Sequence, residues 1–190
     1  MPSAPRLDER AGEILVGSTV RLHHYVPGYY PRGILLRLWE MIEEDGAALD
    51  IFYDHLSEKV PDSPVDTRAE ISEVLSYFAD PKKVIVFVDD PGTNDLMGAF
   101  WLTEIVPGFR ATVNLFFRKR YRGRQAFEAG RRFRDYATDV LGFKSLWGIT
   151  PWKHSVAMGR WLGMKTVAVL PHFHLVNGVP MDSYILKLER

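Results

Sequence analysis

The stretch at residues 117–130, FRKRYRGRQAFEAG, places five basic side chains around Gly123 and leads into a pattern typical of a helix. Anions are the ligands that such residues favour, because arginine offers a planar fork of donors to phosphate or carboxylate oxygens. Gly123 lets the backbone approach a ligand closely or adopt a positive φ. From these residues alone three interpretations stay open: the cluster binds nucleic acid, binds the phosphates of a cofactor, or forms a solvated turn.

The elements on either side of this basic cluster decide how it can act. Residues 111–117 and 145–150 predict strands, and apolar residues that recur every three or four positions over 127–141 predict a helix between them. Two strands joined by a helix are expected to run parallel. The cluster then lies at the carboxyl end of a strand and the amino end of a helix, where free N–H groups and the helix dipole favour an anion. Candidate phosphate ligands are Arg118, Arg122 and Arg124.

The rest of the chain predicts one mixed α/β domain over residues 1–190, since a chain of this length buries most of its unfolded surface. Further strands are predicted over 14–26, 84–88, 96–106 and 165–170, and further helices over 33–44, 67–78 and 151–163. Short proline and glycine turns between the strands of 84–117 favour an antiparallel meander, and Asn177-Gly178 favours a closing hairpin. The small, charged and proline residues of 1–12 predict a flexible N-terminus.

Composition narrows the classes of function. Lysine plus arginine (24) balances aspartate plus glutamate (24), which argues against a nucleic-acid binder. The chain has no cysteine, so disulfides, thiolate metal sites and a cysteine nucleophile are excluded. No apolar run approaches the roughly 20 residues of a membrane span, and we predict a cytoplasmic protein. His172 and His174 share a strand face without a nearby ligand partner, so no metal site is predicted.

Motifs in the second half of the chain resemble those of the GNAT superfamily of acyl-CoA-dependent N-acetyltransferases. The phosphate loop of that family reads Arg or Gln, two residues, Gly, one residue, then Gly or Ala, and Arg120, Gly123 and Gln125 occupy these positions. The later helix ends in LGM at 162–164, similar to the family's Leu-Gly-Phe, and the tail NGVPMDSYILKLER is similar to its last strand. Together with the order of elements, the resemblance covers residues 14–189.

This resemblance implies a fold and a cofactor. The fold would be α/β, with a mixed and mostly antiparallel sheet of about seven strands, a parallel βαβ crossover at the cofactor loop and about four helices. The cofactor would be acetyl-CoA, its pantetheine arm against the backbone of 115–117 and its pyrophosphate on the amides of 122–127. The implied cofactor-binding residues are Leu115, Phe116, Phe117, Arg118, Arg122, Gly123, Arg124, Gln125, Ala126 and Phe127.

The chain also departs from the family pattern. Gln125 replaces the second glycine of the loop, and Phe127 stands where many members have a third. Trp152 lies where members often have asparagine, and Gly159 lies where a tyrosine commonly protonates the leaving thiolate. The candidates for a replacement proton donor are Ser155 and Tyr121.

Catalysis in such a fold needs a base for the ammonium substrate and donors for the oxyanion. Glu104, near a strand end, is the candidate base, and Asn114, a polar residue within an apolar strand, is the candidate orienting group. Because no cysteine can carry the acyl group, direct transfer in a ternary complex is the simpler mechanism. The first hypothesis is an N-acetyltransferase acting on a small-molecule or peptide primary amine. The alternative is a catalytically degenerate GNAT-fold structural or interaction protein, of the kind that phages encode.

Overall fold

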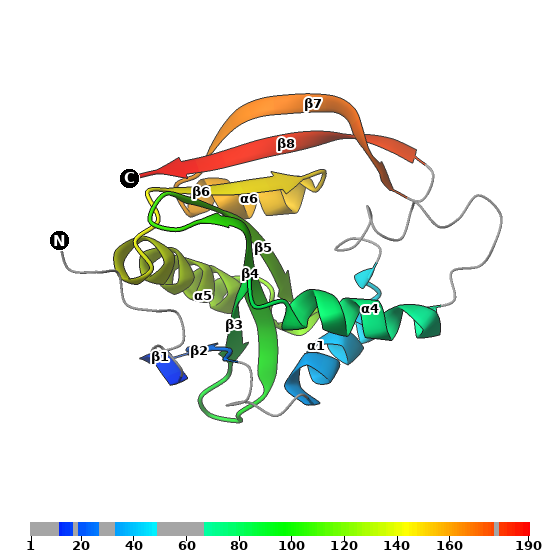
Figure 1. Ribbon diagram of the computed structural model, residues 1–190, viewed down its shortest axis with the longest axis vertical. Coiled ribbons are helices and arrows are strands. Elements are labelled where there is room, and N and C mark those ends of the chain that lie inside the picture. The colour runs from blue at the N-terminus through cyan, green and yellow to red at the C-terminus, as the bar shows by residue number, and fades with distance from the viewer. Residues whose placement is uncertain (1–11, 17–18, 27–32, 49–66, 177–178) are drawn as a thin grey trace.

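A single sheet of eight strands forms the centre of the described chain, which in this computed structural model comprises residues 12–16, 19–26, 33–48, 67–176 and 179–190. The strands are β1 Gly12–Val16, β2 Arg21–His24, β3 Val84–Asp89, β4 Leu96–Val106, β5 Arg110–Phe117, β6 Ser145–Thr150, β7 Lys165–Val176 and β8 Val179–Glu189. The α-helices among these residues are α1 Gly33–Glu44, α4 Thr67–Ala79, α5 Arg124–Asp135 and α6 Lys153–Trp161 (Figure 1). The predicted class, α/β with about seven strands and about four helices, is confirmed.

The strand order is β1-β2-β3-β4-β5-β6-β8-β7, and every neighbouring pair is antiparallel except β5 and β6. The predicted meander of β3, β4 and β5 and the predicted parallel crossover from β5 to β6 are therefore confirmed. β7 and β8 form the predicted hairpin, whose Asn177-Gly178 turn lies outside the described residues. So do residues 1–11 of the predicted flexible N-terminus.

The prediction of one strand over 14–26 is wrong. The chain forms two strands there, β1 and β2, which pair antiparallel with Glu13 opposite His23. A Gly17-Ser18 pair separates them in the sequence, and such a pair is a turn signal between two β-rich runs. The short hairpin occupies the edge of the sheet and does not change the order of the strands that follow.

Helices cover both faces of the central strands, so the core has two halves. Ile85 and Phe87 of β3 pack in one half with α1 and α4, whereas Val84, Val86 and Val88 pack in the other half with α5. Alternate residues of a strand point to opposite faces, and five consecutive buried residues in β3 show that neither face meets solvent. Figure 1 shows α1 and α4 side by side, with α5 across the sheet from them.

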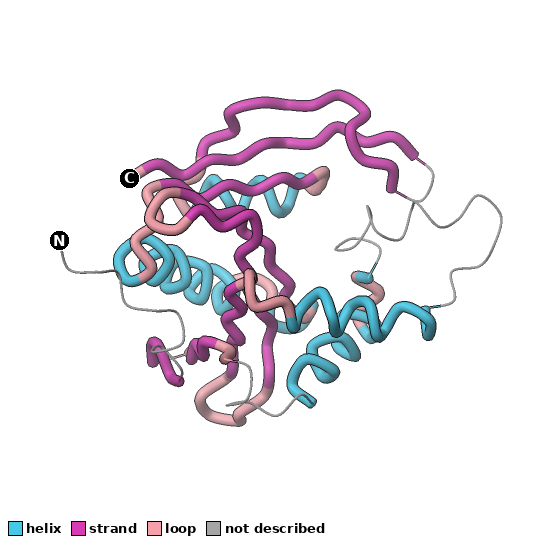
Figure 2. The backbone as a smooth tube through the Cα atoms, in the orientation of Figure 1, coloured by secondary structure: helices cyan, strands magenta, loops and turns pink. Residues whose placement is uncertain are grey.

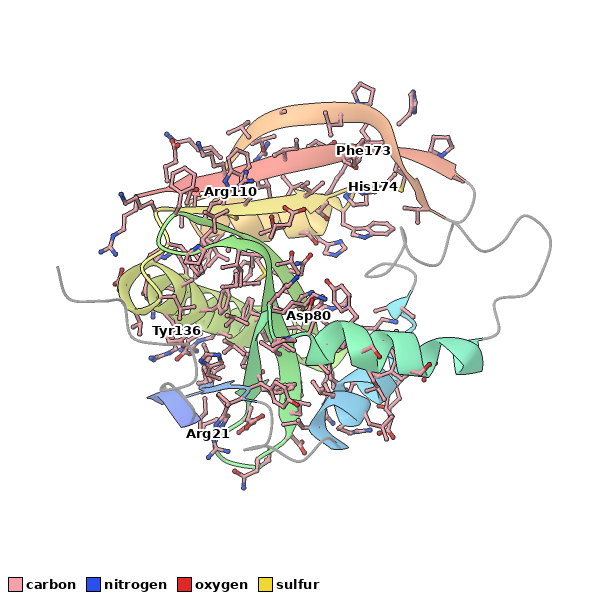
Figure 3. All side chains as sticks on the ribbon, viewed as in Figure 1. Arg21, Asp80, Arg110, Tyr136, Phe173 and His174 are labelled. Atoms are coloured by element: carbon pink, nitrogen blue, oxygen red, sulfur yellow. The ribbon has the colours of Figure 1, made fainter. Side chains whose placement is uncertain are left out.

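The predicted helix over 127–141 begins earlier and changes its winding before it ends. α5 starts at Arg124, and its last turn widens into a π-turn over Tyr136–Val140. The hydroxyl of Tyr136, labelled in Figure 3, lies 3.0 Å from Nδ1 of the buried His24 and so ties this turn to β2. This contact holds the Tyr136 side chain at the residue where the winding of the helix changes from α to π.

Close packing of α5 on α6, and of α6 on the sheet, depends on two glycines. A Cβ on Gly130 would lie 2.9 Å from Met158 Cε, and one on Gly159 would lie 2.7 Å from Leu186 Cδ1 of β8. Both distances are shorter than a real Cβ shows, so a side chain at either position would require the end of the Met158 or Leu186 side chain to shift. None of the described helices is long and apolar enough to cross a membrane.

Candidate functional site

A cleft opens where β5 and β6 separate. Their parallel pairing consists of Arg110 with Ser145, Ala111 with Leu146 and Thr112 with Trp147, and beyond that point the strands diverge (Figure 2). The cavity beside the cleft has a volume of about 450 Å³ and a mostly apolar lining. Residues 113–117 of β5 all line it, so the backbone groups on this edge of the strand face the cavity instead of a neighbouring strand.

A glycine turn closes one end of this cavity. A short 3-10 turn over Lys119–Tyr121 leads to Gly123, whose φ of 109° and ψ of −134° are open to glycine but not readily to other residues. α5 begins at the next residue, and Phe127 N–H donates to Gly123 O at 3.0 Å. The N–H groups of the first turn have no acceptor within the helix, and the positive end of the helix dipole lies beside them. The predicted anion geometry, a strand end followed by a helix amino end, is present.

Two of the five basic side chains of the loop are held in ion pairs, Arg118 with Glu44 at 2.7 Å and Arg120 with Asp95 at 3.1 Å. The backbone N–H of Lys119 also donates to the Asp45 carboxylate at 2.6 Å. These contacts anchor the loop to the carboxyl end of α1 and to the turn before β4. Residues 118–120 of the cluster therefore act as a surface turn that is anchored by its acidic neighbours.

Two other basic side chains of the loop remain available to an anion. Arg122 Nε donates to Phe117 O at 3.1 Å, which leaves the terminal nitrogens of its guanidinium group without another hydrogen bond among the described residues. Arg124 is exposed and makes no ion pair within the described chain. Arg122 and Gly123 line the cavity, so the free positive charge lies at its glycine end.

Most of the implied cofactor-binding residues gather around the cavity. Those that line it are Leu115, Phe116, Phe117, Arg122, Gly123, Ala126 and Phe127. Those that do not are Arg118, Arg124 and Gln125, which lie outside the lining although they belong to the same loop and first helical turn.

The predicted catalytic residues are not brought together. Asn114 and Ser155 both line the cavity, and Asn114 Nδ2 donates to Thr103 Oγ1 at 3.2 Å. Glu104 does not line it. It lies at an irregularity of β4 with a φ of 49°, and it accepts a hydrogen bond of 2.8 Å from Thr112 Oγ1.

Tyr121 is also outside the lining, and its hydroxyl donates to Asp95 at 3.1 Å. Partial burial, together with that hydrogen bond, raises the pKa of the Tyr121 phenol above its ordinary value. A phenol that already donates to a carboxylate is poorly placed to protonate a ligand in the cavity.

Sequence reasoning missed His154. This side chain lines the cavity in the first turn of α6, where its ring stacks on Trp152 with a centroid distance of 6.2 Å. Only Arg122, Arg134 and His154 are ionisable among the described lining residues. The signal that could have found His154 is its place directly after β6, since the crossover puts that strand end beside the basic loop.

Gly159, the residue at the position of the family's tyrosine, also lines the cavity. A Cβ there would lie 2.7 Å from Leu186 Cδ1, so a side chain at this position would require the end of the Leu186 side chain to shift. Arg134, at the far end of the cavity, is held by Asp135 and by Leu162 O. The described residues contain no group of three or more histidines and carboxylates that could hold a metal ion.

No protein-family model and no curated protein sequence matches the chain. Solved structures are similar to it: a spermidine N-acetyltransferase from Vibrio cholerae, in complex with CoA and spermine, has a TM-score of 0.68 at 16% identity over 91% of this chain and 96% of that one. A probable acetyltransferase has a TM-score of 0.67 at 17% identity over 94% and 97% of the two chains. The order of the strands, the opening between β5 and β6, and the glycine turn before α5 agree with this likeness. The chain therefore has the fold of the GNAT acetyltransferases.

Proposed function

We propose that the chain is an acetyl-CoA-dependent N-acetyltransferase that acts on a primary amine by direct transfer in a ternary complex. The proposal rests on one observation: three features that suit coenzyme A line the same cavity. These are the unpaired edge of β5, the glycine turn with the amino end of α5, and the free guanidinium group of Arg122. An extended amide chain suits the strand edge, and a pyrophosphate suits the helix end.

The residues present fit coenzyme A at the glycine turn. No atom lies within 4 Å of the position that a Cβ on Gly123 would take, so a ligand can approach the backbone there. Gln125 and Ala126 still offer their amide hydrogens although Gln125 replaces a glycine. Arg122 and Arg124 supply the countercharge for phosphate oxygens.

Bound acetyl-CoA would supply a thioester carbonyl for the amine to attack and a thiol as the leaving group. The chain's own residues must then hold the amine, accept its proton and protonate the departing sulfur. Imidazole is the side chain that most often moves protons near neutral pH, and we place His154 in the role of proton donor. Ser155 and Asn114 are the polar lining residues that could orient the carbonyl oxygen. The role of Glu104 as base stays a prediction and would require water between its carboxylate and the cavity.

The first experiment is a calorimetric titration of acetyl-CoA into the purified protein. It is followed by an assay of thiol release with spermidine and with a peptide that has a free amino terminus. We expect saturable binding and amine-dependent release of free thiol. The proposal fails if no binding occurs at millimolar acetyl-CoA. Binding without turnover of either amine would favour the alternative of a GNAT-fold binding module. Gln125 in place of a loop glycine and Gly159 in place of the tyrosine also favour that alternative.

His154→Asn tests the proposed proton donor, and His172→Asn is its matched control. His172 is an exposed histidine on β7 that does not line the cavity. We expect kcat to fall roughly 100-fold in His154→Asn, as general acid catalysis commonly contributes, with acetyl-CoA affinity unchanged. Equal rates in the two variants would remove His154 from the mechanism.

A further inference from the structure

The cavity reaches both faces of the sheet through the opening between β5 and β6. Phe133 of its lining belongs to the core half with α5, whereas Trp101 and Phe116 belong to the half with α1 and α4. The glycine turn and the first turn of α5 lie on the α5 side. With the phosphates of acetyl-CoA bound there, we expect the amine to enter from the α1 and α4 side, which we call the acceptor end.

The acceptor end has an almost wholly apolar lining. Trp101 lies opposite Asn114 across β4 and β5, so their side chains share a face with Phe116, two residues further along β5. On β6 the neighbouring Gly148 faces the α6 side of the sheet, so Ile149 faces the acceptor end, where 41% of its surface is exposed. The described residues that line this end are Ala47, Trp101, Asn114, Phe116 and Ile149.

The cavity offers no negative charge within the described part of its lining. Its ionisable residues there are Arg122, Arg134 and His154, none of which is a carboxylate. The carboxylate of Glu104, the predicted base, lies outside the lining and accepts a hydrogen bond from Thr112. An ammonium group would lose its hydration among apolar walls and would meet only like charges. The described lining therefore disfavours a cationic acceptor.

The polar group at the acceptor end is the side-chain amide of Asn114. Its Nδ2 donates to Thr103 Oγ1 at 3.2 Å, and its Oδ1 has no hydrogen-bond partner among the described residues. Oδ1 can therefore accept a hydrogen from a neutral amine. The rings of Trp101 and Phe116 line the cavity beside this amide and suit an apolar or aromatic body.

We propose that the acceptor is a primary aromatic amine, bound as the neutral free base with its ring beside Trp101 and its nitrogen at Asn114 Oδ1. This inference rests on the proposed function and narrows its substrate class. The nitrogen of an aromatic amine shares its lone pair with the ring and stays unprotonated at neutral pH, so no carboxylate has to remove a proton before attack. An aliphatic amine with a pKa near that of lysine is neutral in only about one molecule in 1,000 at pH 7.

The transfer balances without a further reactant. The amine nitrogen forms a bond to the acetyl carbon, and the bond between that carbon and sulfur breaks. One hydrogen leaves the nitrogen and one proton reaches the sulfur, so the products are an N-aryl acetamide and free coenzyme A. His154, the proposed proton donor, is the lining residue that can return this proton.

The test compares 4-methylaniline with benzylamine, which are isomers and differ in whether the nitrogen is attached to the ring. Spermidine is the third amine. Binding of each amine to the purified protein is measured by ligand-observed NMR, and turnover is measured as thiol release from acetyl-CoA at pH 7. We expect 4-methylaniline to bind more tightly than benzylamine and to have a kcat/KM at least about tenfold higher, because so little benzylamine is neutral at this pH.

Two variants place a carboxylate at the acceptor end, Asn114→Asp within the cavity and Ile149→Glu at its exposed rim. Asn94→Asp is the matched control, since Asn94 is exposed in the turn between β3 and β4 and does not line the cavity. A carboxylate near an amine favours its protonated form by about 1–3 pKa units. Both variants should therefore shift the preference towards benzylamine by about tenfold or more, and the control should keep the native preference. Circular dichroism establishes that each variant is folded.

The inference is overturned if benzylamine or spermidine reacts as fast as 4-methylaniline with the native chain. It is also overturned if the folded carboxylate variants keep the preference of Asn94→Asp. In those outcomes the proposed function survives, because thiol release still depends on an amine. Absence of acetyl-CoA binding, or binding without thiol release with any of the three amines, would instead overturn the proposed function and this inference together.

Discussion

Gly123 joins the 3-10 turn to α5 in a conformation, φ 109° and ψ −134°, that residues with a side chain rarely adopt. Holding an L-residue in such a region costs about 1–3 kcal/mol. No atom lies within 4 Å of the place that a Cβ would occupy, so Gly123→Ala adds backbone strain without a steric clash. We expect the free energy of unfolding to fall by about 2 kcal/mol, even though alanine also restricts the unfolded chain. For a chain of this length that corresponds to a Tm roughly 4–8 °C lower.

The matched control is Gly142→Ala. Gly142 also has a positive φ, 76°, with no atom near its missing Cβ, but it follows the π-turn and does not line the cavity. Differential scanning calorimetry should show a loss of Tm in both variants. Titration of acetyl-CoA should show a loss of affinity of at least about tenfold, or about 1.4 kcal/mol, in Gly123→Ala alone.

Two results would refute this reasoning at different steps. A Tm of Gly123→Ala equal to that of the native chain would show that the turn relaxes freely and that its conformation carries no strain. Equal acetyl-CoA affinities in Gly123→Ala and Gly142→Ala would show that the glycine turn does not hold the phosphates.

Two further predictions concern stability. A Cβ on Gly98 of β4 would lie 2.2 Å from the backbone oxygen of Phe116, so Gly98→Ala should lower the free energy of unfolding, measured in guanidinium, by about 3 kcal/mol or more. The control is Gly148→Ala, whose Cβ would have its nearest neighbour at 3.8 Å and which should cost much less. Equal unfolding midpoints for the two variants would contradict the close approach of β4 and β5. The hydrogen bond from Thr19 Oγ1 is the main cause of the lowered pKa of the Glu128 carboxyl in the folded chain. The bond therefore stabilises the fold at any pH above the pKa that this carboxyl has in the unfolded chain. That stabilisation is lost as the pH falls through the lower pKa of the folded chain. Thr19→Val should therefore lower the free energy of unfolding by about 1 kcal/mol at pH 7. The difference in this free energy between the variant and the native chain should shrink below about pH 4.3. A difference that does not depend on pH would show that the bond does not favour the ionised carboxylate.

Local sequence patterns predicted most of the elements because strand and helix signals act over a few residues. α1, β4 and β6 have the predicted bounds, and the crossover from β5 to β6 is parallel as its length required. The glycine and the arginines of residues 117–130 also placed the anion geometry at the start of α5. The split of the first strand into β1 and β2 was missed because a two-residue turn signal lay inside a β-rich run.

The sequence by itself therefore determined the class of fold, the crossover and the position of the basic loop. Only the tertiary structure decided which charges of that loop are free. Arg118 is paired with Glu44, which lies 74 positions earlier in the chain, and Arg120 is paired with Asp95, whereas Arg122 and Arg124 remain available. The same is true of α6, whose packing places His154 in the cavity lining and Trp161 against Phe127, a residue of that lining. The physical reason is that ion pairing and cavity lining depend on contacts between segments far apart in sequence, and no local periodicity records those contacts.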